Sequence, residues 1–260
     1  MKTTHKLIIG DALEELAKIP DESVDLVFAD PPYNMSKKRG LGWKYSKHIT
    51  MQEEWDIFSK DDYLKFNQKW ISESLRILKH GGSLWVCGSF HNIYQVGFIL
   101  QHIEDVKINN SIVWFKPNAQ PNITCRMFTE STEHLIWASK NGNGKKWKFN
   151  YDLIKKLNEG KQMRNVWSIP LTPKSEKWAG QHPTQKPMEL LRRIILACTD
   201  EGNTVLDPFL GSGTTSVVAK MLDRNSIGIE KEKRYYQIIK KRLNEPQKKI
   251  EEYVEVGYNE

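Results

Sequence analysis

A near-continuous apolar run at residues 24–29, Val-Asp-Leu-Val-Phe-Ala, constrains the fold more than any other feature of the chain. Runs of this kind are typical of strands in the middle of a parallel sheet, where both faces are covered. Strand-like and helix-like segments alternate along the sequence, and that order predicts an α/β protein with a parallel sheet. We expect strands at residues 6–10, 24–29, 83–87, 111–115, 134–138, 204–206 and 226–229, and helices at 12–19, 61–78, 96–100, 189–198 and 214–222.

The composition narrows the class of protein. A chain of 260 residues suits one sizeable domain, with or without a lobe-sized insertion. Its 39% hydrophobic and 27% charged residues are typical of a soluble globular protein, and no apolar run approaches the ~18 residues that span a bilayer. The N-terminal segment is too short for a signal-peptide core. Three separated cysteines (Cys87, Cys125 and Cys198) predict neither a disulfide framework nor a zinc site, so we expect no metal and a cytoplasmic location.

Positive charge is concentrated in one quarter of the chain. The formal net charge is +7, and residues 117–180 hold eleven Lys and Arg against five Asp and Glu. A lysine-rich solvated surface would also explain this excess, but a lobe that faces phosphates is the better interpretation. We therefore expect a separate target-recognition lobe at 117–180, between a first half at 1–116 and a second half at 181–260.

The tetrapeptide Asp30-Pro31-Pro32-Tyr33 directly follows the apolar run. Ligands of open α/β sheets bind at the carboxyl ends of the strands, where this motif is expected. The two prolines fix the backbone and present stiff carbonyl acceptors. A carboxylate, a fixed carbonyl and an aromatic ring together suit a flat base that carries an amino group. A proline-rich turn would explain the prolines but not the tyrosine.

A glycine-rich turn, Asp207 to Thr215 (DPFLGSGTT), lies between an expected strand and an expected helix. Glycines at such a turn let the backbone approach a ligand and aim the helix N-terminus at an anionic group. The motif lacks a Walker lysine and the GxGxxG spacing, which argues against a nucleoside triphosphate or a dinucleotide. Glu230 ends the next strand, where an acid suits a ribose diol. A nucleoside with a short zwitterionic tail fits these parts, and S-adenosylmethionine is the obvious candidate.

The two motifs together resemble those of the β-class DNA amino-methyltransferases, in which the catalytic motif precedes the cofactor motif. Segments 88–94, 114–126 and 176–180 are similar to the second, single-strand-tolerant GATC adenine methyltransferases of DpnII-type restriction systems. The resemblance implies a circularly permuted, Rossmann-like methyltransferase sheet and N6 methylation of adenine in DNA, as part of a restriction-modification system. The expected partner is double-stranded DNA. Action on single-stranded DNA and formation of a homodimer stay open. GANTC-specific methyltransferases share much of the same sequence, so GANTC stays open as the recognition site.

Site residues follow from the motifs and from the resemblance. The catalytic candidates are Asp30, Pro31, Pro32 and Tyr33. Residues expected to contact the cofactor are Asp11, Asp30, Thr184, Lys186, Asp207, Phe209, Gly211, Ser212, Gly213, Thr214, Thr215 and Glu230. Candidates for DNA contact are Lys37, Lys38, Arg39, Asn122, Arg126, Lys145, Lys146 and Lys148.

Three alternatives remain open from the sequence. N4-cytosine methyltransferases resemble this family but usually carry Ser where Asp30 stands. RNA methyltransferases usually place the cofactor motif first. A non-catalytic DNA-binding module would not need both active-site motifs. His91 and His182 are expected to serve structure or DNA contact rather than catalysis.

Overall fold

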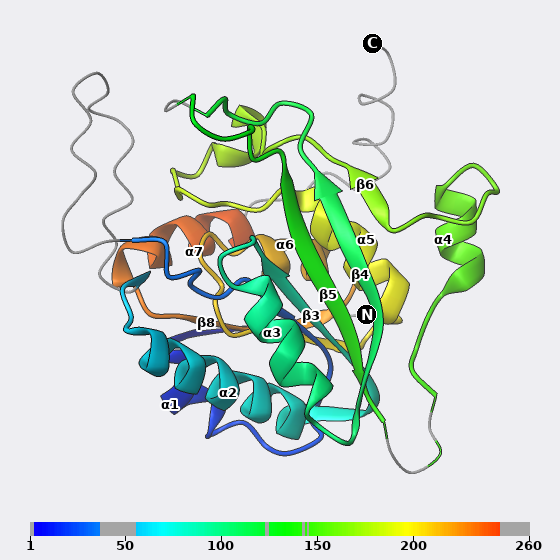
Figure 1. Ribbon diagram of the computed structural model, residues 1–260. Coiled ribbons are helices and arrows are strands. Elements are labelled where there is room, and N and C mark those ends of the chain that lie inside the picture. Colours follow the sequence, from blue (N-terminus) through cyan, green and yellow to red (C-terminus); the bar gives the residue numbers. More distant parts are fainter. Residues whose placement is uncertain (1–2, 37–55, 123–124, 142–143, 145, 245–260) are drawn as a thin grey trace.

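The computed structural model describes residues 3–36, 56–122, 125–141, 144 and 146–244, and within them the chain forms one eight-stranded sheet (Figure 1). The strand order is β1-β8-β7-β2-β3-β5-β4-β6. The strands are β1 (His5–Ile9), β2 (Val24–Ala29), β3 (Leu78–Gly88), β4 (Val106–Phe115), β5 (Thr132–Lys140), β6 (Val166–Ser168), β7 (Thr204–Asp207) and β8 (Asn225–Glu230). The apolar run at 24–29 is therefore a central strand, as the sequence predicts.

Helices cover both faces of the sheet (Figure 1). One face packs against α1 (Ala12–Leu16), α2 (Lys60–Ile77) and α3 (Ile93–Gln101), and the other against α4 (Tyr151–Leu157), α5 (Met188–Cys198) and α6 (Thr214–Met221). The helix α7 (Tyr236–Asn244) and the 3₁₀ helices η2 (Lys174–Lys177) and η3 (Lys233–Tyr235) complete the described elements.

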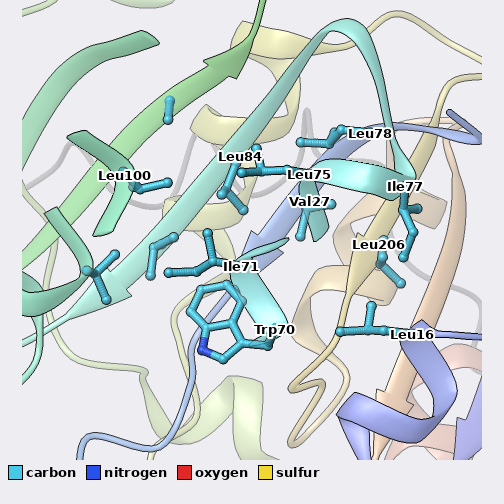
Figure 2. Close-up of a cluster of buried hydrophobic side chains, with 14 of the residues drawn as sticks. Leu16, Val27, Trp70, Ile71, Leu75, Ile77, Leu78, Leu84, Leu100 and Leu206 are labelled. Atoms are coloured by element: carbon cyan, nitrogen blue, oxygen red, sulfur yellow. The ribbon is translucent and has the colours of Figure 1, made fainter. Parts of the chain in front are cut away.

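The alternation of side chains along the central strands explains why the core has two parts. Val27 of β2 faces the cluster of α1 and α2, whereas its neighbours Leu26 and Phe28 face the cluster of α5 and α6. Figure 2 shows the first cluster, in which Trp70 and Ile71 of α2 pack against these strands. A strand buried on both faces must be apolar at nearly every position, which is what the run at 24–29 provides.

Every strand except β5 ends at the same edge of the sheet. β5 runs antiparallel to both β3 and β4, and the other pairs are parallel. We call the edge where the seven parallel strands end the carboxyl edge, and the other the opposite edge. The segment that joins β4 to β5 lies at the carboxyl edge, and the segment that joins β5 to α4 lies at the opposite edge.

The expected lobe at 117–180 differs from the structure in one respect. β5 and β6 come from this range and lie in the sheet, so the range is not a unit separate from it. β6 has only three residues, too few for a recognisable apolar pattern. What remains of the range outside the sheet falls into stretches at both edges.

Candidate functional site

The two motifs meet because β2 pairs with β7. Leu26 lies opposite Val205 and Val27 opposite Leu206, so Asp30 and Asp207 follow neighbouring strand ends at the carboxyl edge. About 180 residues of sequence separate these two aspartates. The edge carries two cavities that adjoin at Asp30.

The first cavity has a volume of about 290 Å³ and lies against the ends of β1, β7 and β8; we call it the glycine-loop cavity. Two glycines of the turn have left-handed backbones, with φ of 56° at Gly211 and 85° at Gly213. A Cβ atom on Gly211 would lie 3.1 Å from the ring of His182, and one on Gly213 would lie 3.0 Å from Ile239. Both positions therefore require glycine. All of the expected cofactor residues except Gly213 line this cavity.

Backbone N–H groups hold the carboxylates of the glycine-loop cavity. Asp207 accepts from the N–H of Phe209 at 2.9 Å and from the hydroxyl of Thr215. Glu230 accepts from Gly211 and from Glu232, both at 2.7 Å. Burial raises the pKa of Glu230, and it raises the pKa of Asp207 to about 7. These contacts fix the shape of the loop, while apolar side chains such as Phe28 and Phe66 line the same cavity.

The second cavity, of about 340 Å³, is lined by all four residues of the Asp30–Tyr33 motif, and we call it the Asp30 cavity. Its wall also includes Phe90, Trp114, Glu130 and Glu133 from β3, β4, β5 and their loops. The two cavities share a set of lining residues, which are Asp30, Pro32, Thr184, Gln185 and Lys186. A ligand in one cavity and a ligand in the other would therefore meet at Asp30.

A chain of ion pairs surrounds the Asp30 carboxylate. Lys186 Nζ lies 2.8 Å from one Asp30 oxygen and 3.3 Å from Glu133, whose other oxygen lies 3.3 Å from Lys116 Nζ. The hydroxyl of Tyr33 donates to Asp30 at 2.6 Å and lies 3.2 Å from Glu133. Two carboxylates and two ammonium groups balance one another in a space that leaves each side chain 16% exposed or less. Buried charges are stable only when they are paired in this way.

The pKa values of the chain follow from this pairing. Burial raises the pKa of Asp30, against the opposing attraction of Lys186. Burial alone would lower the pKa of Lys186, but Asp30 and Glu133 raise it overall, so the ammonium form persists. Burial opposes ionisation of Glu133 too, yet Lys186 and Lys116 lower its pKa below the ordinary value. Asp30 therefore sits between a cation that favours its ionised form and an anion that disfavours it.

Sequence reasoning missed Glu133, Lys116 and Cys87 as members of this site. Glu133 is the second residue of β5, and Cys87 Sγ lies 3.4 Å from its carboxylate. The sequence offered one signal, an acidic residue at the start of an apolar strand. It also assigned Lys186 to the cofactor alone, whereas the structure pairs this lysine with Asp30 and brings it into both cavities.

The DNA-contact candidates fall at different edges. Arg126 is exposed and, with Asn122, belongs to the segment between β4 and β5 at the carboxyl edge. Lys146 and Lys148 lie near the opposite edge, where the Lys148 N–H bonds to Gly81 and its ammonium lies 2.6 Å from Asp200. The structure thus does not bring these two lysines to the site. Lys37, Lys38, Arg39 and Lys145 lie outside the described residues.

The two histidines line the two cavities, His182 the glycine-loop cavity and His91 the Asp30 cavity. His182 is buried against Tyr235, with ring centroids 4.3 Å apart, and burial lowers its pKa to about 4. His91 bonds to Ser89 at 3.1 Å, and burial lowers its pKa as well. Both rings are therefore neutral near pH 7.

The fold and the paired cavities define a class of protein. A glycine loop beside an apolar cavity with an acid at the next strand end suits an adenosyl group with a charged tail. The adjoining carboxylate and proline carbonyl suit an amino group. Together they are the features of an S-adenosylmethionine-dependent methyltransferase that acts on an amine.

The chain belongs to the DNA methylase family of N6 and N4 methyltransferases, whose model matches residues 24–241. It is 50% identical over 239 residues to the type II methyltransferase M2.DpnII of Streptococcus pneumoniae, across 91% of this chain and 88% of that protein. The M1.HpyAVI–SAM complex shares 28% identity and a TM-score of 0.69, across 93% of this chain and 100% of that one. The cytosine-N4-specific PvuII methyltransferase shares 21% identity and a TM-score of 0.74, across 98% of this chain and 92% of that one. At this identity the likeness shows the fold alone.

These comparisons confirm the family, the permuted α/β fold, methyltransferase activity, S-adenosylmethionine as cofactor and DNA as partner. The roles of individual residues stay predictions. Within the described part of the chain, none of the helices has the length and apolar character that a membrane crossing requires.

Proposed function

We propose that the protein methylates N6 of adenine in DNA, most specifically within GATC. The observation that carries the chemistry is the junction of the two cavities at Asp30 and Pro32. With the cofactor in the glycine-loop cavity and an extruded adenine in the Asp30 cavity, the two reactants would meet beside a carboxylate. A base must leave the duplex to reach such a pocket, at a cost of a few kcal/mol.

The residues of the Asp30 cavity supply what the amine lacks as a nucleophile. The N6 lone pair is delocalised into the ring, so N6 must be drawn towards a tetrahedral geometry before it attacks. Asp30 and the Pro31 carbonyl each accept one N6 hydrogen, which stabilises positive charge as it develops; a contact of this kind is worth about 3 kcal/mol. S-adenosylmethionine, held by the residues of the glycine-loop cavity, would supply a methyl group activated by its positively charged sulfur. Asp30 then takes the proton that N6 releases.

The surrounding ions keep Asp30 ready for this role. Lys186 favours the carboxylate form, and the hydroxyl of Tyr33 fixes the orientation of the same carboxylate. Each carboxylate oxygen has a second lone pair, so Asp30 can accept from N6 while both partners stay in place. The ring of Tyr33 lines the cavity and would stack on the base, which returns about 1–3 kcal/mol of the extrusion cost.

Adenine is favoured over cytosine because Asp stands where N4-cytosine enzymes of similar sequence usually carry Ser. GATC is favoured by the likeness to methyltransferases of DpnII-type systems, including the 50% identity with M2.DpnII. Side chains of the segment between β4 and β5 would read the site. Asn122 suits an adenine edge and Arg126 a guanine edge. Glu130 of that segment and Lys177 of η2 line the Asp30 cavity, which supports recognition by the carboxyl-edge parts of 117–180.

Action on single strands as well as duplexes, a homodimer and a partner restriction nuclease are further parts of the proposal that rest on the same resemblance. A cytoplasmic location rests instead on the three separated cysteines. Sedimentation of the purified protein tests the homodimer.

The decisive experiment uses duplex oligonucleotides that carry GATC, GANTC or neither, with tritiated S-adenosylmethionine. Mass spectrometry then identifies the modified nucleoside. We expect N6-methyladenine in the GATC duplex alone. N4-methylcytosine would overturn the chemistry, whereas N6-methyladenine in GANTC would overturn only the choice of sequence.

A further inference from the structure

A third cavity, of about 280 Å³, lies away from the carboxyl edge and is lined by residues of β4, β5, α4 and the segments next to α4. None of its lining residues also lines the glycine-loop cavity or the Asp30 cavity. Asn109 of this cavity lies six positions before Phe115, where β4 reaches the carboxyl edge. At ~3.3 Å per residue, the cavity lies about 20 Å from that edge. We call it the distal cavity.

Four aromatic side chains line the distal cavity, which are Trp137, Trp147, Phe149 and Tyr151. Phe149 and Tyr151 line it with ring centroids 6.4 Å apart, and Phe149 also lies 5.4 Å from the ring of Trp137. Phe149 is 41% exposed and Tyr151 42% exposed, although both are large. The two ring planes are inclined by 53°, so a flat ligand can stack on one of these rings while the other packs beside it.

The charge of the distal cavity is positive. Lys107 and Lys155 line it, and Lys107 Nζ lies 4.0 Å from the ring centroid of Trp147. No acidic residue appears among its described lining residues. Lys146, next to Trp147 in the sequence, is exposed. A ligand that carries negative charge beside its flat ring would complement this wall.

A hydrogen-bond donor completes the cavity. The pairing of β4 with β5 is irregular between Ile108 and Asn110, and this bulge sets Asn109 apart from the regular ladder. Asn109 Oδ1 accepts from the Ser139 hydroxyl at 3.5 Å, whereas within the described residues its buried Nδ2 has no hydrogen-bond partner. Bulges often re-aim side chains near functional sites. Because this atom is closed to solvent, an acceptor on a bound ligand reaches it only when the side chain turns towards the cavity.

We propose that the distal cavity binds an unpaired nucleotide of the DNA strand on which the enzyme acts, an inference that rests on the proposed function. The base stacks on Tyr151 beside the inclined ring of Phe149, its edge faces Asn109, and Lys107 and Lys155 face the phosphates. The base must be unpaired, because neighbours in a duplex cover both of its faces. About 20 Å corresponds to about six nucleotides at the ~3.4 Å rise of a stacked strand, so one strand can occupy the Asp30 cavity and the distal cavity together.

The test measures binding without methylation. The probe is a fluorescein-labelled oligothymidylate of about 15 nucleotides, which contains no adenine, and fluorescence anisotropy gives its Kd. We expect Tyr151→Ala and the double variant Lys107→Ala/Lys155→Ala each to raise the Kd at least tenfold. Tyr151→Phe keeps the ring and should keep the wild-type Kd. The control Lys65→Ala/Lys69→Ala removes equal charge from exposed positions of α2 and should have no effect.

An unchanged Kd in both the Tyr151→Ala and the lysine variants overturns the proposal. A second outcome also overturns it. If a variant sediments as a monomer where the wild type is a dimer, and its Kd for the probe is unchanged, the cavity is an interface between copies of the chain. Methylation of a GATC duplex is measured in parallel, and we expect kcat within twofold of wild type in every variant. A wild-type protein that binds the probe through these residues but methylates no DNA supports this inference and refutes the proposed function.

Discussion

The glycine-loop cavity and the Asp30 cavity lie side by side at one edge of the sheet, yet they hold their carboxylates in different ways. Asp207 and Glu230 accept from backbone N–H groups within a few residues or on the neighbouring turn. Asp30 and Glu133 are held by Lys186 and Lys116, which come from distant parts of the chain. One cavity is shaped by the local backbone and the other by side-chain charges brought together by the fold.

This difference separates two tasks. A carboxylate fixed by backbone groups presents a constant shape to a ligand, which suits the binding of a cofactor. A carboxylate held by side-chain charges has a pKa that those charges set, which suits proton transfer. Changes in the Asp30 cavity should therefore alter rate and its pH dependence, whereas changes in the glycine-loop cavity should alter cofactor affinity.

Asp30→Ala should produce the largest effect. We expect kcat to fall more than a hundredfold, because the loss of ~3 kcal/mol of transition-state stabilisation corresponds to that factor. Cofactor affinity, measured by calorimetry, should stay within a few-fold of wild type. A variant that keeps more than about a tenth of the wild-type turnover would remove Asp30 from the chemistry.

Lys186→Met and Glu133→Gln should shift the acid limb of the kcat–pH profile in opposite directions. Activity requires the Asp30 carboxylate, so it is lost as pH falls through the pKa of that group. Lys186 lowers this pKa and Glu133 raises it. The lysine variant should therefore lose activity at a higher pH than wild type, and the glutamate variant at a lower pH, each by about one unit.

The two variants serve as controls for each other, because they remove opposite charges from the surroundings of the same carboxylate. Raising the pH should restore part of the activity of Lys186→Met, which a merely misfolded protein would not do. Thermal unfolding of both variants checks that the fold survives. Shifts in the same direction would show that the two residues act through structure and not through charge.

Glu230→Ala should weaken cofactor binding about tenfold with little change in kcat at saturating cofactor. The change removes the expected acceptor for the ribose, a loss of about 1–2 kcal/mol. It also frees the N–H groups of Gly211 and Glu232. Glu230→Gln retains one acceptor oxygen, so its Kd for S-adenosylmethionine should lie between those of wild type and Glu230→Ala. Calorimetry with S-adenosylmethionine decides the matter, and an unchanged Kd would exclude the assignment.

Arg126→Ala should give the smallest effect, confined to DNA. We expect KM for a GATC duplex to rise about fivefold to tenfold, the lower end of the loss for one specific base contact, with cofactor affinity unchanged. Lys146→Ala removes the same charge at the opposite edge and should leave KM for this duplex unaltered. Equal effects of the two variants would mean that the edges do not differ in duplex contact.

The sequence predicts the glycine-loop cavity better than the Asp30 cavity for a physical reason. The contact of Gly211 with Glu230 involves one turn and the next strand of the chain. The spacing of the glycines and the acid at the strand end indicate such a contact directly. The pairing of Lys186 with Asp30 depends on the order of strands in the sheet, which no local pattern contains. Glu133 was missed because only the antiparallel insertion of β5 beside β3 brings it to the site.

Helix and strand positions were largely predictable for similar reasons. The expected helix at 61–78 is α2, which begins after Ser59, whose hydroxyl accepts from the Asp62 N–H at 3.1 Å. Short elements such as β6 were not predictable, since three residues carry no periodicity. The positions of Lys146 and Lys148 were also beyond the sequence, because β5 runs back to the opposite edge before they follow.

The pairing of β2 with β7 has a consequence for synthesis on the ribosome. Asp30 emerges early, but the wall of the glycine-loop cavity requires β7 and β8, which are made only after residue 204. Contacts between such distant segments also close slowly during folding. A nascent or truncated chain that ends before β7 therefore contains the whole Asp30–Tyr33 motif without a partner strand for β2 on that side. Such a fragment has no cofactor cavity, so incomplete copies of the chain cannot modify DNA.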